Sequence, residues 1–390
     1  MSRRALGLVL GLAAAAGPLL AQERLIERGR TVIEPVGMLW RFSEPLAQDS
    51  LSIDRVWQLS FPVSTSVALG DWILDVGAAA SVGGVRLADG RTLDLKGLTD
   101  AKLRLVGHLI RDRLLVTAGL NAPIGTTRLA GTELDVLRVL GSPALALRTP
   151  YLGLGLGGTA GLVFAGQAGD WGLAIGASIE ARGRYAPVES RIAGVARDTD
   201  LDPGNAVRLS LGADRLVGGG RLSFLVAADL FGEDRILTAA PGSEPFEANF
   251  KLGPQLSVDA LLELAPRGFQ RVTLSLSDRY RTKFTGIDGA KADGSAGNRL
   301  ELAAEALTGG AGASGGLYGR VTGRLDGGLE VDPTITTAAA TIGTLTLGVW
   351  RRAGRALVQP FVQVAGGRID PGPATATALG FGAGVSVTVR

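Results

Sequence analysis

Hydrophobic and polar residues alternate along most of this chain with a period of two. From Trp171 to Tyr185 the odd positions carry mainly large apolar or aromatic residues, whereas the even positions carry Gly, Ala, Ser, Glu and Arg. A period of two is typical of a β-strand with one apolar and one polar face. At roughly 3.3 Å per residue and a strand tilt near 40°, this segment covers roughly 35 Å along a membrane normal. The pattern predicts a strand that crosses a bilayer with an aromatic residue at each interface.

The same alternation continues through the rest of the chain, and the segments that separate the strands are short and long in turn. Short turns include Gly70-Asp71 and Gly169-Asp170, each followed by a Trp. Longer polar segments lie at about residues 84–98, 122–150, 185–204, 232–246, 284–297, 326–337 and 366–376. This spacing predicts an all-β fold, a closed antiparallel transmembrane β-barrel over residues 36–390, with periplasmic turns and extracellular loops. We expect about 16 strands, or 14 if the first pair is not in the wall.

A soluble β-sandwich would also show alternating strands, so the polar face has to distinguish the two folds. In this chain charged residues stand in the middle of strands, as at Lys102, Arg104, Glu180 and Asp259. Such residues suit the water-filled interior of a barrel better than the exposed face of a sandwich. The barrel is therefore the preferred interpretation.

One long loop carries a different pattern. Between Gly131 and Ser142 the apolar residues recur at helical spacing, and Thr132 is a candidate N-cap with Asp135 three positions later. The sequence predicts one short amphipathic helix in an extracellular loop. It either folds into the lumen as a constriction or caps the outer rim of the barrel, and the rim is the favoured placement.

The first 21 residues have the features of a secretory signal peptide. Arg3 and Arg4 form a basic start, residues 5–16 are apolar, and Ala21 offers a cleavage point. The alternative is a membrane anchor helix, but the apolar run is shorter than the ~20 residues that span a bilayer. We expect residues 22–35 to be a periplasmic N-terminal segment, and the bacterial cell outer membrane of a Gram-negative cell to be the location.

Composition limits the chemistry. The chain has no Cys and one His, His108, which excludes thiolate and multi-His metal sites, and we expect neither a metal nor a cofactor. The 40 basic and 37 acidic residues nearly balance, so charge gives no reason to expect nucleic acid as a partner. Gly153 to Gly158 match a dinucleotide-binding motif and Gly312 to Gly316 match a hydrolase motif, but strand-like or glycine-rich sequence surrounds both. A barrel hydrolase with His108 as its base stays open as a minor alternative, and we expect no enzyme.

Two motifs resemble a known family of membrane barrels. Gly97-Leu98-Thr99-Asp100 precedes an alternating strand, and Leu120-Asn121-Ala122-Pro123-Ile124-Gly125 follows the next turn. These segments are similar to those of the bacterial outer-membrane transporter-like barrels grouped with the meta-pathway phenol degradation porins, with Thr99 standing where that family has Gly. The resemblance covers residues 95–165 by motif. It implies an outer-membrane barrel that passes small solutes, including aromatic ones.

The charges on the predicted inward faces suggest what could pass. Basic residues outnumber acidic ones there, so we expect an outer-membrane pore or transporter for small solutes that are anionic or aromatic. The residues predicted to line the pore are Lys102, Arg104, Arg182, Arg184, Lys251, Arg271, Arg279, Arg281 and Lys283. The expected partners are small solutes, outer-membrane lipid and lipopolysaccharide, and the barrel insertion machinery. A barrel with a structural or surface-interaction role is the alternative function.

Overall fold

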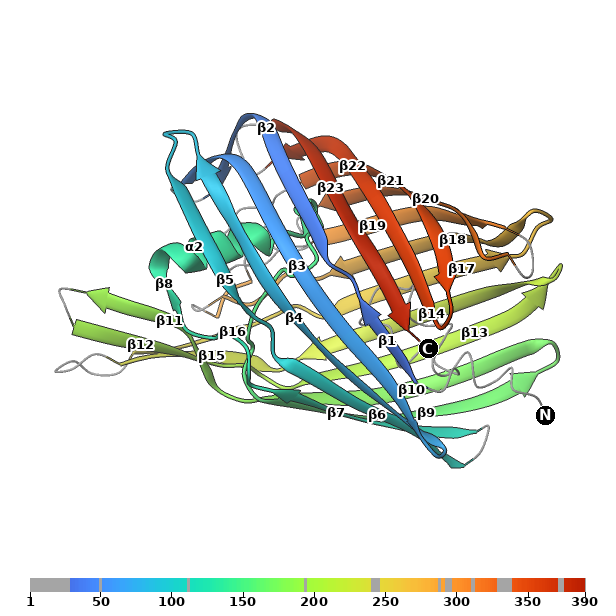
Figure 1. The fold of residues 1–390 in the computed structure, drawn as a ribbon. Coiled ribbons are helices and arrows are strands. Elements are labelled where there is room, and N and C mark those ends of the chain that lie inside the picture. The colour runs from blue at the N-terminus through green and yellow to red at the C-terminus, as the bar shows by residue number, and fades with distance from the viewer. Residues whose placement is uncertain are drawn as a thin grey trace.

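The computed structural model describes residues 29–48, 51–110, 113–192, 195–239, 246–286, 289–291, 297–309, 313–327, 339–370 and 375–389. Its main feature is a closed antiparallel barrel (Figure 1). The predicted signal peptide lies outside the described residues. No helix in the described part of the chain is both long and apolar enough to span a membrane.

Eighteen strand segments form the wall and occupy 16 positions around it, which confirms the predicted number. They are β1 (Arg30–Ile33), β2 (Val36–Gln48), β3 (Leu51–Leu69), β4 (Trp72–Leu87), β5 (Thr92–Leu98), β6 (Ala101–Ile110), β7 (Leu114–Ala122), β9 (Gly157–Ala168), β10 (Trp171–Arg182), β13 (Ala206–Val217), β14 (Gly220–Phe231), β17 (Gln255–Leu264), β18 (Phe269–Arg281), β19 (Gly297–Thr308), β20 (Gly315–Gly327), β21 (Ala339–Ala353), β22 (Ala356–Asp370) and β23 (Ala376–Val389). Pairing of β23 with β1 and β2 closes the wall.

Two positions in the wall are each shared by two segments. Both β1 and β2 lie between β23 and β3, and both β5 and β6 pair with β4. Because β1 is part of the wall, the wall begins before residue 36. Because β4 continues to Leu87 and β5 follows it, the segment 84–98 that the sequence assigns to a loop is mostly strand.

The outer face of the wall is apolar. Large side chains there are about half exposed, for example Ile175 at 57% and Leu211 at 57%, whereas their strand neighbours of opposite parity are less exposed. The two Gly-Asp-Trp segments make the predicted short turns, since Gly70 and Gly169 have φ angles of +66° and +58° that favour glycine. Each turn leads directly into a strand that begins at its Trp.

A second sheet of five strands extends from the long-loop end of the barrel (Figure 1). It contains β8 (Leu129–Ala130), β11 (Tyr185–Ile192), β12 (Val195–Asp202), β15 (Glu233–Ala239) and β16 (Phe246–Lys251). The polar segments 185–204 and 232–246 are therefore largely hairpins that pair with each other, not irregular loops.

Polar and apolar residues alternate without interruption from residue 247 to 263, as in one continuous strand, but the structure divides this segment. Strand β16 ends at Lys251 and β17 begins at Gln255, with Gly253 and Pro254 between them. Proline cannot donate a backbone hydrogen bond to a sheet, and a Cβ on Gly253 would lie 2.1 Å from the carbonyl oxygen of Thr282. The strand therefore breaks here, and Lys251 lies in the outer sheet.

Candidate functional site

The connection between β7 and β9, residues 123–156, folds into the barrel, and we call it the lumen segment. It contains β8, the helix α2 (Gly131–Leu140) and the 3-10 turn η2 (Pro143–Leu145). The helix begins one residue before the predicted N-cap Thr132, because the Glu133 carboxylate accepts a hydrogen bond from the backbone N–H of Ala130 at 2.9 Å.

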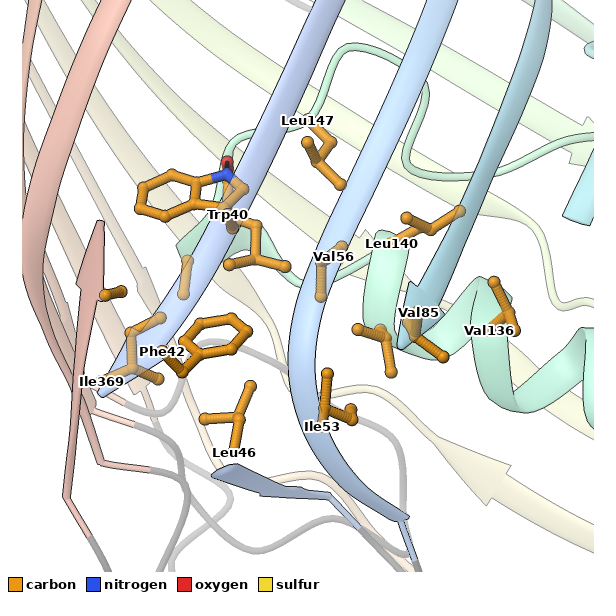
Figure 2. Close-up of a cluster of buried hydrophobic side chains, with 14 of the residues drawn as sticks. Trp40, Phe42, Leu46, Ile53, Val56, Val85, Val136, Leu140, Leu147 and Ile369 are labelled. Atoms are coloured by element: carbon orange, nitrogen blue, oxygen red, sulfur yellow. Dashed lines mark hydrogen bonds between the residues drawn. The ribbon is translucent and has the colours of Figure 1, made fainter. Parts of the chain in front are cut away.

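The apolar face of α2 packs on the inner face of β3 to β5. Val136 and Val139 are fully buried, and Leu140 lies close to Val85 and Val56 of the wall (Figure 2). The helix is therefore inside the mouth of the lumen, and the placement on the rim is wrong. The physical reason is that the inward side chains at this level are apolar, so they bury the helix face better than an aqueous rim would.

Apolar side chains from almost half of the wall complete this cluster. The inward residues that surround the lumen segment are Trp40, Phe42, Leu46, Ile53, Val56, Val85, Leu87, Leu95, Ala340, Ile342, Ala365, Ile369, Ala376 and Ala378, from β2 to β5 and β21 to β23. Trp40 is 1% exposed and lies above Phe42 in the same cluster (Figure 2). This side of the lumen is filled with packed side chains at the long-loop end.

Hydrogen bonds fix the lumen segment to separate parts of the wall. The indole N–H of Trp40 donates to the carbonyl oxygen of Leu145 at 3.1 Å. The side-chain amide of Gln58 makes two bonds to the backbone of Thr149, at 2.7 and 3.1 Å. From β20, the Arg324 guanidinium donates to the carbonyl oxygen of Ala144. The segment thus reaches from β2 and β3 to β20.

Asp100 holds both ends of the lumen segment. Its carboxylate accepts hydrogen bonds from the backbone N–H of Gly125 at 2.9 Å and of Leu154 at 2.6 Å. The Asn121 side chain donates to the same carboxylate at 2.8 Å. Asp100 is only 3% exposed, so these bonds replace the water that a buried carboxylate needs.

The two family-like motifs build this anchor. A Cβ on Gly125 would lie 2.7 Å from both the backbone N and Oδ1 of Asp100, so only glycine allows the close approach. Thr99 also has a local role, because its hydroxyl accepts a hydrogen bond from the backbone N–H of Ala79 at 2.8 Å. Gly155 adopts a φ of +81° against Tyr185 of β11, whose pKa is raised by burial. The sequence points to Thr99, Asp100 and Gly125 through the family resemblance, but not to Gly155 or Tyr185.

The opposite part of the wall carries ion pairs on its inner face. They join neighbouring strands from β4 to β20: Asp75–Arg104 at 2.7 Å, Arg208–Asp229 at 2.9 Å, Arg221–Asp214 at 3.0 Å, Arg271–Glu305 at 2.9 Å and Arg320–Glu301 at 3.7 Å, together with Arg299–Asp326. The inner surface therefore has two sides, one packed with apolar groups and one charged.

Most of the cations predicted to line the pore on this wall have polar partners. Arg104 and Arg271 belong to the pairs above, Arg182 lies 3.6 Å from Glu180, and Lys102 donates to the Tyr151 hydroxyl of the lumen segment at 2.9 Å. Arg281, at the end of β18, also has an interaction, as does Lys283, which lies two residues beyond the strand and so outside the wall. Within the described ranges, Arg279 of β18 has no ion pair, and its neighbours across the strands are Ser257 and Arg299.

Arg184 and Lys251 lie elsewhere. Arg184 lies between β10 and β11 and pairs with Asp200 of β12, and Lys251 ends β16, so neither residue is in the barrel wall. The sequence analysis missed Asp214 and Asp326, which face inward and pair with arginines. The surplus of inward cations is consequently smaller than predicted. Both aspartates could have been identified from the sequence, because each stands at an inward-facing position in the alternation of its strand.

The chemical motifs form no recognisable catalytic centre among the described residues. Gly153 to Gly158 lead into the strand β9 and not into a helix, as a dinucleotide site requires. His108 pairs in register with Leu115, and its buried Nδ1 has no hydrogen-bond partner in the described part of the chain. No group of three or more potential metal ligands occurs within the described ranges.

Comparison with known proteins finds similarity in structure only. No family model and no curated protein matches the sequence. Among solved structures, a mutant of the TodX monoaromatic hydrocarbon channel aligns with a TM-score of 0.48 and 10% identity, covering 97% of this chain and 94% of that chain. OprB of Pseudomonas putida aligns with a TM-score of 0.46 and 11% identity, covering 96% of this chain and 97% of that chain. The CymD monoaromatic hydrocarbon channel aligns with a TM-score of 0.41 and 12% identity, covering 94% of this chain and 90% of that chain.

Proposed function

We propose that this chain is an outer-membrane channel for small polar solutes with a weak preference for anions. The observation that supports it most is the division of the inner surface into a packed side and a charged side. The apolar outer face fits a surrounding bilayer, whereas the inward ion pairs between β4 and β20 give the inner surface a charged character that suits water and polar solutes. The solute path therefore follows the charged side, past the lumen segment.

Arg279 is the residue to which we attribute the anion preference. Its cross-strand neighbours on the inner face are Ser257, which is uncharged, and Arg299, which pairs with Asp326. A guanidinium without a fixed counter-ion in a low-dielectric wall raises the local concentration of anions. The aromatic solutes implied by the family resemblance fit this path less well, because the apolar side of the lumen is filled by the lumen segment.

The test is the reversal potential of the reconstituted protein in a planar bilayer under a salt gradient. We expect ion conductance with a small anion preference, and Arg279→Gln should shift the potential toward cations. Arg215→Gln is the matched control, because it removes the same charge from the outward face, where Arg215 lies beside Trp171. Absence of conductance would contradict the channel and favour a structural barrel, and a cation-selective wild type would contradict the anion preference.

A further inference from the structure

Three arginines form one row on the outer surface of the barrel. Arg41 of β2 pairs in register with Arg55 of β3, and Arg55 pairs with Arg86 of β4. Their strand neighbours Trp40, Val56 and Val85 are buried in the lumen cluster, so the three arginines point to the opposite side. Arg55 and Arg86 lie near the long-loop ends of β3 and β4, and Arg41 lies at the same level in the middle of the longer strand β2.

The chain itself neutralises this row only in part. Asp54 pairs with Arg55 at 3.0 Å. Arg41 and Arg86 make no hydrogen bond or ion pair with any residue that the structure describes, although Glu44 and Asp94 stand on β2 and β5. Like charges directly opposite each other on neighbouring strands destabilise a sheet. The row therefore lowers the stability of the barrel unless an anion from outside the chain binds to it.

The surface next to the row is apolar and faces the membrane. In the adjacent row toward the short-turn end, Leu39 pairs with Trp57. Further along β3, Leu59, Phe61 and Val63 are 40%, 42% and 42% exposed. Along this face of β3 the cation Arg55 is followed by Trp57 and then by the apolar residues Leu59, Phe61 and Val63. This order matches the headgroup and the acyl chains of an anionic lipid.

We propose that Arg41, Arg55 and Arg86 bind the phosphate groups of an outer-leaflet lipid of the lipopolysaccharide class, whose acyl chains lie on Leu59 and Phe61. Adjacent strands are ~4.8 Å apart, so the row spans roughly 10 Å and offers several guanidinium groups to one headgroup. A planar guanidinium binds phosphate through two parallel hydrogen bonds. This site rests on the location in the outer membrane and is independent of conduction through the lumen.

The experiment measures binding of bisphosphorylated lipid A to the purified, delipidated protein in a neutral detergent. Arg41→Gln and Arg86→Gln should each weaken binding about tenfold, the loss expected for one charge-assisted hydrogen bond. Arg41→Lys should retain part of the affinity because the charge remains. Arg351→Gln is the control, since Arg351 is an exposed arginine of β21 at the short-turn end. Circular dichroism establishes that each variant is folded.

A comparison of three ligands distinguishes binding of a lipid from binding of a free anion. Dephosphorylated lipid A should bind at least tenfold more weakly than lipid A, and millimolar inorganic phosphate should not displace lipid A. Unchanged binding by the Arg41→Gln/Arg86→Gln double variant would overturn the site. Equal binding of dephosphorylated lipid A would exclude phosphate recognition, and displacement by inorganic phosphate would assign the row to a free anion. None of these results changes the conductance that tests the proposed function.

Discussion

Arg324 on β20 donates a hydrogen bond to the carbonyl oxygen of Ala144, which precedes it by 180 residues. The same guanidinium lies 3.0 Å from the carboxylate of Asp326, and Arg324 is 8% exposed. One side chain thus joins the charged side of the lumen to the segment that fills the other side.

Arg324→Gln should widen the path. The variant loses a charge-assisted hydrogen bond to the lumen segment, which stabilises a protein by about 1.5–3 kcal/mol. We expect a lower free energy of unfolding by about that amount and a larger single-channel conductance. Arg320→Gln removes the same charge from the same face of β20, where the partner is Glu301 and not the lumen segment. If both variants conduct alike, Arg324 does not hold the segment in place.

Asp100→Ala should release both ends of the lumen segment. The backbone N–H groups of Gly125 and Leu154 lose their acceptor, and we expect destabilisation of roughly 2–4 kcal/mol. Frequent transitions to a higher conductance should follow, together with faster proteolysis within residues 127–150. Asp89→Ala provides the comparison, because Asp89 is exposed in the turn between β4 and β5 and pairs with Arg91. A variant with wild-type conductance noise and proteolysis would show that the anchor lies elsewhere.

Leu209→Arg and Ser210→Arg distinguish the two faces of β13. Leu209 is 49% exposed on the outward face, whereas Ser210 faces inward and lies diagonally from Asp229. Arginine on the lipid face costs about 2–4 kcal/mol near the bilayer midplane. We therefore expect poor refolding into lipid vesicles for Leu209→Arg and nearly normal refolding for Ser210→Arg. Equal damage by both substitutions would argue against a bilayer around this face.

If residues 1–21 are the signal peptide that the sequence predicts, they are removed during secretion. Cleavage after Ala21 should leave Gln22 as the first residue of protein isolated from outer membranes. N-terminal sequencing or intact-mass measurement checks this directly. A mature chain that retains Arg3 would contradict the prediction.

The alternation of residue types determines the barrel because it is a local property. Whether a residue faces lipid or lumen follows from its parity in the strand, so segments such as residues 171–182 show their two faces without any knowledge of their neighbours. The short and long connections likewise predict the number of strands that the structure contains. Local rules fail at Gly253-Pro254, where backbone sterics interrupt a continuous alternation.

Only the tertiary structure decides which inward residues meet. The register between strands sets that Asp214 pairs with Arg221 and Asp75 with Arg104, and parity does not contain this information. The position of the lumen segment depends on the same register, because the indole of Trp40 has to lie beside the carbonyl oxygen of Leu145, which is 105 residues away in the sequence. A helix with one apolar face packs wherever apolar side chains surround it. Closure of the barrel brings β2 to β5 next to β21 to β23, and this places the apolar surface inside the lumen.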